Sequence, residues 1–382
     1  MSAWPIAPEP FRIEPIFSER LWGARSLAPF FPEVRDLKSP IGEAWLTALD
    51  CRVANGQFAG KMLGQAWKEM TIPWRGSRFE GDVDFPLLLK FIFPTEKLSI
   101  QVHPDDAYAA HHETAAGGHG KTEMWHVVSA EPRARLLAGL KPGVTKEKFL
   151  ASLADHTLED LFQSYETHAG DTFFIPPGMP HTIGPGMIIC EVQEYSDLTY
   201  RIHDYDRRDA NGKPRELHIE KALEVINFTS STGGKVEPRP QFFGDKKLGE
   251  NLVDCQYFST WRLEFDQLVH FNMRPSPPHR FSLWVFLEGE GEVDWSCNPH
   301  DMSRSNYGDF QYKQGECWFV PAVIGSHGYY PRKKTSLLIA SPRNPKLYST
   351  SDNEVTPEGG LSWMGKSLVA MSSTSRGKFT GK

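Results

Sequence analysis

Four side chains along this sequence have the chemistry of metal ligands. Gln101 offers an amide oxygen and Glu123 offers a carboxylate. His103 and His181 each offer an imidazole nitrogen. Donors of this kind suit Zn²⁺ and also Fe, Ni or Mn. Their separations along the chain are too long for a short motif, so spacing alone does not distinguish a metal site from ordinary strand and turn residues.

The segment KLSIQVHPDD, residues 97–106, alternates polar and apolar positions. Successive side chains on a strand point to opposite faces, so Ser99, Gln101 and His103 would share one face. Lys97 begins the same polar row. A surface strand would turn this row to water, whereas a barrel interior would gather its cation, hydroxyl, amide and imidazole in one place.

Three more residues could act beside such a row. Lys121 shares strand parity with Glu123, and Glu191 lies on a strand predicted over residues 187–195. Arg201 follows ten residues after Glu191. Taken singly, each has a commoner explanation: a solvated lysine, a buried structural ion pair, or an arginine paired with the aspartates around it.

Composition limits the classes of partner. The chain has 382 residues, 40% of them hydrophobic and 24% charged, with a formal net charge of −6. These values predict a soluble globular protein and argue against general nucleic-acid binding, which needs a basic face. The N-terminus lacks a signal-peptide pattern, no apolar run approaches the ~20 residues of a membrane span, and five scattered cysteines indicate reduced thiols. We therefore expect a cytoplasmic protein, and the net charge leaves room for an anionic small substrate, which needs only a few local cations.

Short apolar alternations between turn signals predict a mainly β protein. The predicted strands are residues 87–93, 98–103, 124–129, 134–139, 172–175, 187–195, 281–287, 316–320 and 336–340. A helical insertion is expected at about 140–165, with one helix capped by Thr145 and a second over 157–162. A further amphipathic helix is expected at about 215–226, with Leu217 on its apolar face.

The domain prediction rests on a linker-like stretch at about 228–242 and on an internal echo. GDTFFIPPG, residues 170–178, is matched by GECWFVPA, residues 315–322, which suggests two related β-barrels. The second barrel shows no comparable set of ligands. The predicted units are a catalytic domain over 1–228, a degenerate barrel over 229–345, and a C-terminal extension over 346–382 with a disordered end.

Four ordered motifs together resemble the type I mannose-6-phosphate isomerases, which are cupin-fold, zinc-dependent enzymes. The motifs are KLSIQVHPDD, GKTEMW at 120–125, GDTFFIPPGMPH at 170–181, and IICEVQEYSDLTYRIHDYDR at 188–207. The resemblance covers residues 10–228 well. It implies a mainly β fold of two cupin-type jelly-roll barrels with a small helical insertion.

The resemblance also implies a role for each residue singled out above. The metal ligands would be Gln101, His103, Glu123 and His181. The catalytic residues would be Arg201, Glu191 and Lys121, with Glu191 the first candidate for the base and Lys121 its competitor. Lys97, Ser99 and Lys121 would contact the substrate phosphate.

The implied activity is a zinc-dependent interconversion of mannose 6-phosphate and fructose 6-phosphate by proton transfer through an enediolate, with one ion per chain and other divalent metals possible. Two alternatives remain open at this point. One is a related cupin isomerase acting on another or an unphosphorylated sugar, and the other is a non-catalytic sugar-binding cupin that retains its metal. The sequence leaves the oligomeric state open between monomer and homodimer.

Overall fold

The computed structural model describes residues 8–81, 83–208, 211–229, 233–243, 246–272, 280–297 and 307–343. These residues are mainly β and form four antiparallel sheets of seven, five, seven and four strands. The predicted C-terminal extension, residues 346–382, lies outside the described residues. No helix in the described part of the chain is long and apolar enough to span a membrane.

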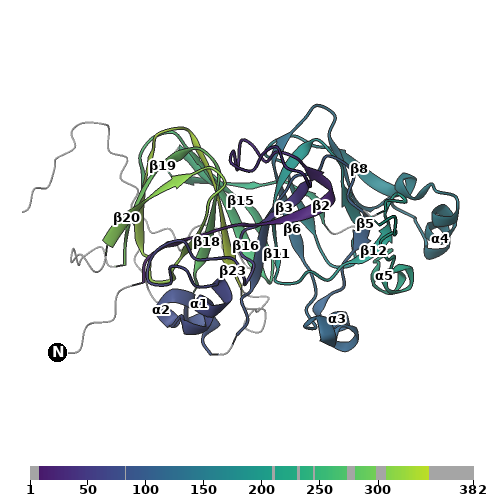
Figure 1. Cartoon of the computed structure of the whole chain (residues 1–382), viewed down its shortest axis with the longest axis horizontal. Coiled ribbons are helices and arrows are strands. Elements are labelled where there is room, and N and C mark those ends of the chain that lie inside the picture. Colours follow the sequence, from purple (N-terminus) through teal and green to yellow (C-terminus); the bar gives the residue numbers. More distant parts are fainter. Residues whose placement is uncertain are drawn as a thin grey trace, which may run out of the picture.

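Two of the sheets form the lobe on the right of Figure 1, called here the first lobe. Its five-stranded sheet has the order β12 (Tyr200–His203), β5 (Ile100–Val102), β10 (His181–Ile183), β7 (Arg135–Leu140) and β8 (Phe162–Glu166). Its seven-stranded sheet has the order β13 (Gly234–Val236), β9 (Thr172–Ile175), β6 (Glu123–Ala130), β11 (Met187–Glu194), β4 (Leu87–Ile92), β3 (Ile41–Trp45) and β2 (Ile16–Ala24).

The other two sheets form the second lobe (Figure 1). Its seven-stranded sheet has the order β1 (Phe11–Ile13), β21 (Cys317–Val320), β18 (Ser282–Glu288), β23 (Thr335–Pro342), β16 (Phe258–Phe265), β15 (Lys246–Asp254) and β14 (Arg239–Phe243). Its four-stranded sheet has the order β17 (Val269–Asn272), β22 (Ser326–Pro331), β19 (Glu290–Ser296) and β20 (Tyr307–Lys313). The echoed segments form β9 and β21, one in each seven-stranded sheet.

The two lobes share one apolar core. Leu89, Phe91 and Val192 of the first lobe lie in the same buried cluster as Val285 and Phe319 of the second. Each fully buried side chain of this size contributes roughly 1.5–3 kcal/mol to folding. The lobes are therefore expected to fold and persist as one unit.

Strands from each side of the predicted boundary at residue 228 cross between the lobes. β1, from the start of the described chain, pairs with β21 of the second lobe, where Phe11 is opposite Phe319. β13, from beyond the boundary, pairs with β9 of the first lobe. The sheets thus interlock the two parts of the chain.

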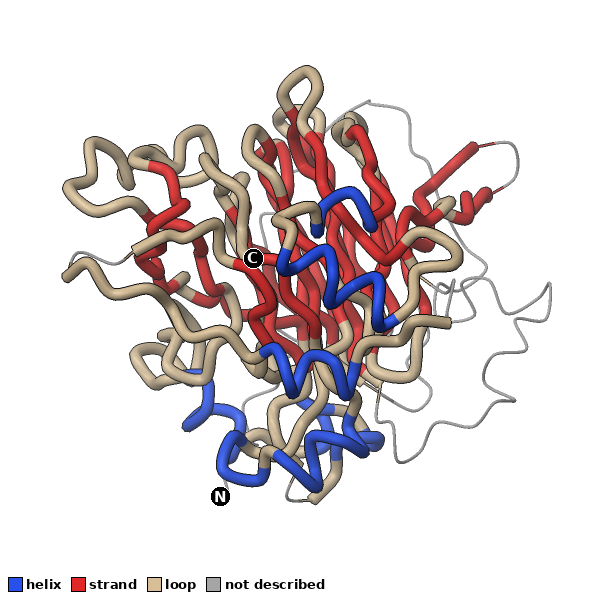
Figure 2. The backbone as a smooth tube through the Cα atoms, turned by 90° about the vertical axis from the view of Figure 1, so that its right-hand side faces the viewer, coloured by secondary structure: helices blue, strands red, loops and turns tan. Residues whose placement is uncertain are grey.

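Short helices lie outside the sheets. They are α1 (Leu63–Glu69), α2 (Ile72–Arg75), η1 (Ser77–Phe79), α3 (Asp106–His112), η2 (Thr114–Ala116), α4 (Lys146–Ala154), η3 (Leu158–Leu161) and α5 (Ile219–Val225). In Figure 2 the helices lie in front of and below the strands. α4 and α5 cover the outer face of the five-stranded sheet, where Ile100 and Val102 pack in one cluster with Phe149 and Ala222.

The predicted helices are present with altered bounds. α4 begins directly after Thr145, whose hydroxyl accepts a hydrogen bond from the Lys148 amide at 3.3 Å. The second predicted helix is the single 3-10 turn η3. α5 starts only at Ile219, so Leu217 lies before it and is 46% exposed.

Candidate metal centre

Strands β4 and β11 explain why polar groups are buried inside the first lobe. Both faces of these strands are covered: every residue of β4 is buried, and so is every residue of β11 except the half-buried Ile188. Leu89 and Val192 belong to the core shared with the second lobe, whereas Lys90 and Glu191 have the opposite parity. The side of the sheet that faces the five-stranded sheet is therefore enclosed, and these charged groups lie on it beside an apolar cluster that joins Ile189 to Ile183. Ser99 and His103, from the row seen in the sequence, are also buried.

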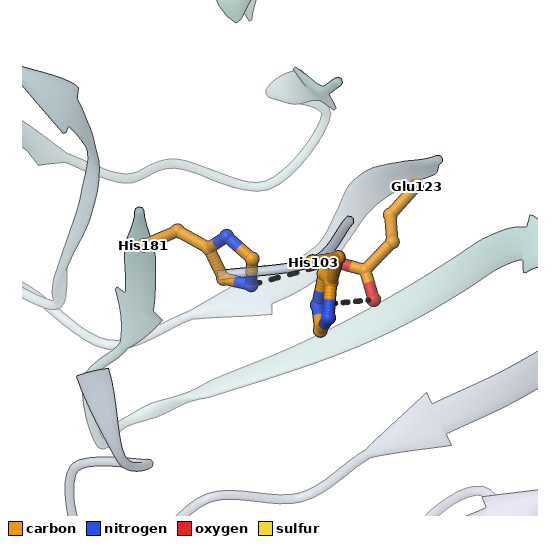
Figure 3. Close-up of side chains that lie close together, drawn as sticks. All are labelled: His103, Glu123 and His181. Carbon is orange, nitrogen blue, oxygen red and sulfur yellow. Dashed lines mark ion pairs between the residues drawn. The ribbon is translucent and has the colours of Figure 1, made fainter. Parts of the chain in front are cut away.

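His103, Glu123 and His181 converge in this interior (Figure 3). His103 directly follows β5, while Glu123 begins β6 and His181 begins β10. The possible ligand atoms of the three residues all lie within 4.8 Å of one another. His103 Nε2 is 3.3 Å from Glu123 Oε1, and His181 Nε2 is 3.6 Å from Glu123 Oε2. All three side chains are buried.

Both histidines present Nε2 to this centre. His103 Nδ1 lies 2.9 Å from the Leu198 carbonyl oxygen, and His181 Nδ1 lies 2.8 Å from the Met179 carbonyl oxygen. A carbonyl only accepts, so each Nδ1 carries the proton and each Nε2 presents a lone pair that can bind a metal. Burial, reinforced by the Lys121 charge, lowers the pKa of His103, and burial with His103 lowers the pKa of His181 to about 3. Both rings are neutral at physiological pH, as metal ligation requires.

Several buried polar atoms here lack hydrogen-bond partners. His103 Nε2 and both Glu123 carboxylate oxygens are buried without a hydrogen bond. Lys121 Nζ forms an ion pair with Glu123 Oε1 at 2.8 Å. Burial, the largest single influence, raises the pKa of Glu123, but Lys121, His103 and His181 together outweigh it, and the pKa falls well below its usual value. Two neutral imidazoles and one ionised carboxylate fit a divalent cation.

Gln101 lies between Arg201 and His181 in a row across three strands. Arg201 on β12 is opposite Gln101 on β5, and Gln101 is opposite His181 on β10. Gln101 Nε2 lies 3.3 Å from His181 Nε2, and Gln101 Oε1 accepts a hydrogen bond from Ser99 Oγ at 3.4 Å. Because a half-turn of the amide exchanges its two ends, Gln101 can turn either oxygen or nitrogen toward the centre.

Glu191 lies in a second row of residues, on the facing seven-stranded sheet, between Trp125 on β6 and Lys90 on β4. Its Oε1 accepts a hydrogen bond from Trp125 Nε1 at 2.9 Å, and its Oε2 is 3.6 Å from Lys90 Nζ. The Trp125 ring lies 5.1 Å from the His181 ring, so this row adjoins the histidines across the lobe. Burial, with a further contribution from Glu123, raises the pKa of Glu191 to about 7.

Lys90 is a site residue that the sequence reasoning missed. It is 2% exposed, and its Nζ lies 3.6 Å from both Glu191 Oε2 and Asp197 Oδ1. The Trp45 ring centre lies 4.9 Å from the same ammonium group. A signal was present, because a lysine inside the apolar run PLLLKFIF is costly to bury without partners.

The other predicted residues lie at different depths. Lys121 is buried, and Glu123, Glu191 and Asp197 raise its pKa above the usual value although burial lowers it, so it remains a cation. Ser99 is also buried, and its hydroxyl bonds to Gln101. Lys97 lies before β5 begins, and its half-exposed ammonium donates to both oxygens of Glu159 at 2.7 and 2.8 Å. Lys97 is thus paired with Glu159, outside the His–Glu–His cluster.

Arg201 is partly buried at the edge of the row. Its Nη1 donates to the Glu216 carbonyl oxygen at 3.0 Å, and its backbone amide donates to His218 Nδ1 at 3.2 Å. Its Nε is buried without a hydrogen bond. Nearby, Asp204 accepts hydrogen bonds from both Arg207 and Arg215. Asp204 is therefore paired mainly with these two arginines and not with Arg201. Arg201 keeps its Nε as a donor without a partner.

Comparisons with known proteins place the chain in a family. The catalytic domain of type I phosphomannose isomerase matches residues 11–128. Mannose-6-phosphate isomerase ManA of Bacillus subtilis (strain 168) is 35% identical over 323 residues, which are 83% of this chain and 94% of that protein. The chain belongs to the type I phosphomannose isomerase family. Mannose-6-phosphate isomerase of Streptococcus mutans is 32% identical over 305 residues, covering 78% of this chain and 91% of that one.

Solved structures of the family share the architecture. The crystal structure of mannose 6-phosphate isomerase from Bacillus subtilis has a TM-score of 0.75 and 27% identity, covering 87% of this chain and 99% of that one. A zinc-bound mannose 6-phosphate isomerase has a TM-score of 0.66 at 14% identity, covering 88% of this chain and all of that one. The phosphomannose isomerase fold thus spans both lobes described above.

Proposed function

We propose that this chain is a metal-dependent mannose-6-phosphate isomerase. The observation that carries the proposal is the buried group of His103, Glu123 and His181, whose ligand atoms lie within 4.8 Å of one another. It occurs in a chain that belongs to the type I phosphomannose isomerase family. Neutral imidazoles and an ionised carboxylate are arranged here for a cation, and Gln101 is the proposed fourth ligand.

The same proposal includes the type of barrel, the metal ion, the substrate and the cellular compartment. We interpret the facing sheets of each lobe as a cupin-type β-barrel, with the site in the first barrel and a packing role for the second. The proposed cofactor is one Zn²⁺ per chain, and the proposed substrate is a sugar phosphate handled in the cytoplasm. The oligomeric state, monomer or homodimer, stays open.

The reaction moves a proton from C2 to C1 of an open-chain sugar and a hydroxyl proton from O2 to O1. Its barrier comes from negative charge that develops on these oxygens in the enediolate. A bound divalent cation supplies Lewis acidity to polarise them. Arg201, directly opposite Gln101 on the neighbouring strand, is placed to add positive charge, and its unused Nε donor supports this role. Lys121, a buried cation, would support the same charge from the other sheet.

Glu191 is the proposed base that carries the carbon-bound proton. A pKa of about 7 matches a general base at neutral pH, because about half of the molecules then hold the reactive carboxylate. Trp125 and Lys90 fix its two oxygens, so the carboxylate is oriented as well as activated. Lys121, the competing candidate, has a raised pKa and is poorly suited to accept a proton.

For the substrate phosphate we propose Lys97, Ser99 and Lys121. Lys97 is the most accessible of the three, because its side chain is 49% exposed and its Glu159 partner is also partly exposed. An exposed ion pair of this kind contributes at most about 1 kcal/mol, so a phosphate can replace Glu159 at little cost. Ser99 and Lys121 lie deeper, so their proposed contacts require the phosphate to approach the interior.

The deciding experiment is a coupled assay with mannose 6-phosphate, combined with elemental analysis of the purified protein. We expect isomerisation, one divalent ion per chain, loss of activity on chelation and recovery with Zn²⁺. Mannose should serve as a control substrate and react far more slowly. Equal rates with the two sugars would favour an unphosphorylated substrate, and full activity after complete metal removal would contradict the metal-dependent proposal.

A further inference from the structure

The segment that leads into Glu123 is held by three successive backbone amides. Gly120 N donates to Asp106 Oδ1 at 2.9 Å, and Lys121 N donates to the Pro104 carbonyl oxygen at 3.1 Å. Thr122 N donates to Glu194 Oε1 at 2.7 Å. Two of the three acceptors are side-chain carboxylates, so the position of this segment depends on what orients those carboxylates.

Asp106 is oriented by the second lobe. Tyr257 Oη donates to Asp106 Oδ2 at 2.8 Å, while Asp106 Oδ1 accepts from the Gly120 amide. Asp106 is the first residue of α3, which lies below the sheets of the first lobe in Figure 1. One carboxylate therefore bridges a tyrosine of the second lobe and the backbone next to Lys121.

Tyr257 is itself firmly placed. It lies in the short connection between β15 and β16, where Cys255 N donates to the Phe258 carbonyl oxygen at 2.9 Å. Its own carbonyl oxygen accepts from Arg343 N at 2.7 Å. The side chain is only 8% exposed and belongs to the core shared by the two lobes. The hydroxyl is thus a fixed donor and not a mobile surface group.

Gly120 packs closely against the same carboxylate-bearing helix end. A Cβ at this position would lie 2.5 Å from Asp106 N and 2.6 Å from Asp105 C. Both are backbone atoms, which cannot move aside as a flexible side chain would. The backbone at Gly120 therefore packs directly against the first residues of α3, with no room for a side chain between them.

We propose that Tyr257 is a positioning residue for the metal centre, acting through Asp106 and Gly120 on Lys121 and Glu123. The second lobe, which supplies no proposed ligand, thereby sets the geometry of the first. This inference deepens and rests on the proposed function. The link is direct, because Lys121 follows Gly120 and its Nζ lies 2.8 Å from Glu123 Oε1.

The first test compares Tyr257→Phe with Tyr312→Phe. Tyr312 is a matched control, since it is buried in the second lobe and makes one hydroxyl hydrogen bond, to Thr335 Oγ1 at 2.9 Å. Hydrogen–deuterium exchange of the metal-free protein should quicken about fivefold over residues 113–123 in Tyr257→Phe alone, as expected for one net hydrogen bond. Zinc retention against a competing chelator should weaken by a similar factor, again only in Tyr257→Phe.

A double-mutant cycle separates the relay from a general loss of stability. Asp106→Ala should have effects at least as large as those of Tyr257→Phe, because it also removes the acceptor of Gly120 N. Adding Tyr257→Phe to it should change exchange and zinc retention no further. Asp106→Asn should stay near wild type, because its amide can accept from Gly120 N and donate to the tyrosine oxygen. Additive effects, or equal effects in Tyr257→Phe and Tyr312→Phe, would overturn the inference. Wild-type protein that retains zinc but lacks isomerase activity would refute only the proposed function.

Discussion

Replacing Glu191 with Gln removes the proposed base while keeping the shape of the side chain. The amide oxygen can still accept the hydrogen bond that Trp125 Nε1 now donates to Glu191 at 2.9 Å. Loss of a positioned general base typically lowers the rate by about 10²–10⁴-fold. We therefore expect kcat for mannose 6-phosphate to fall by this factor, with zinc content unchanged because Glu191 is not a proposed ligand.

The same substitution, which lowers kcat, is expected to raise the stability of the folded protein above pH 7. Burial and Glu123 raise the pKa of Glu191 from 4.5 to about 7 in the folded protein. Below pH 4.5 the carboxyl is neutral in both folded and unfolded chains, and between pH 4.5 and 7 the unfolded chain releases its proton first. Above pH 7 the folded state therefore carries a penalty of about 3 kcal/mol, which Gln does not have. Metal-free Glu191→Gln should be more stable than wild type at pH 8 and equally stable near pH 4.5.

Two measurements check this reasoning. Urea unfolding of the metal-free proteins at several pH values gives the stability difference, and the pH dependence of kcat/KM reports the ionisation of the base. Wild-type kcat/KM should rise with pH through about 7 and then level off. A Glu191→Gln variant that keeps more than a tenth of wild-type kcat would refute the assignment of Glu191 as the base.

Three further substitutions test other parts of the site. Glu123→Gln should lose about 10–100-fold or more in zinc affinity, since the one anionic ligand becomes neutral; retention of zinc in equilibrium dialysis would contradict its role. Arg201→Ala should lower kcat by about 10²–10³-fold with metal content near one per chain, as for loss of an oxyanion donor, and a variant changed only in KM would speak against it. Lys97→Ala should raise KM for mannose 6-phosphate about tenfold while leaving kcat and the reaction of mannose unchanged, which steady-state kinetics can test; equal changes for both sugars would place Lys97 away from the phosphate.

Parts of the fold that depend only on residues adjacent in the sequence could be predicted from it. The cap at Thr145 and the strands predicted at 172–175 and 187–195 follow from local patterns and are present, the second of them ending at Glu194. The polar row around Gln101 was only partly predicted, because β5 starts at Ile100 and Lys97 turns instead to Glu159. The bounds of β5 are set by its pairing with β10 and β12, which are distant in sequence, so a local pattern could not predict them.

Some polar residues near the candidate site could be recognised from the sequence more readily than others. Glu191 could be selected because it follows an apolar run, but Lys90 in a similar run was overlooked. What makes Lys90 a site residue is its contact with Glu191 on the next strand of the sheet and with Asp197 beyond it. That pairing is set by the register of β4 on β11, which places Lys90 opposite Glu191.

By itself the sequence determined the donor types, their parity on each strand and the motifs that resemble a known family, because these are properties of consecutive residues. Only the tertiary structure decided that His103, Glu123 and His181 meet within 4.8 Å, and that Tyr257 reaches Asp106 across 151 positions of chain. The physical reason is that strand pairing and lobe packing join segments through a common hydrophobic core, whose register no local pattern specifies.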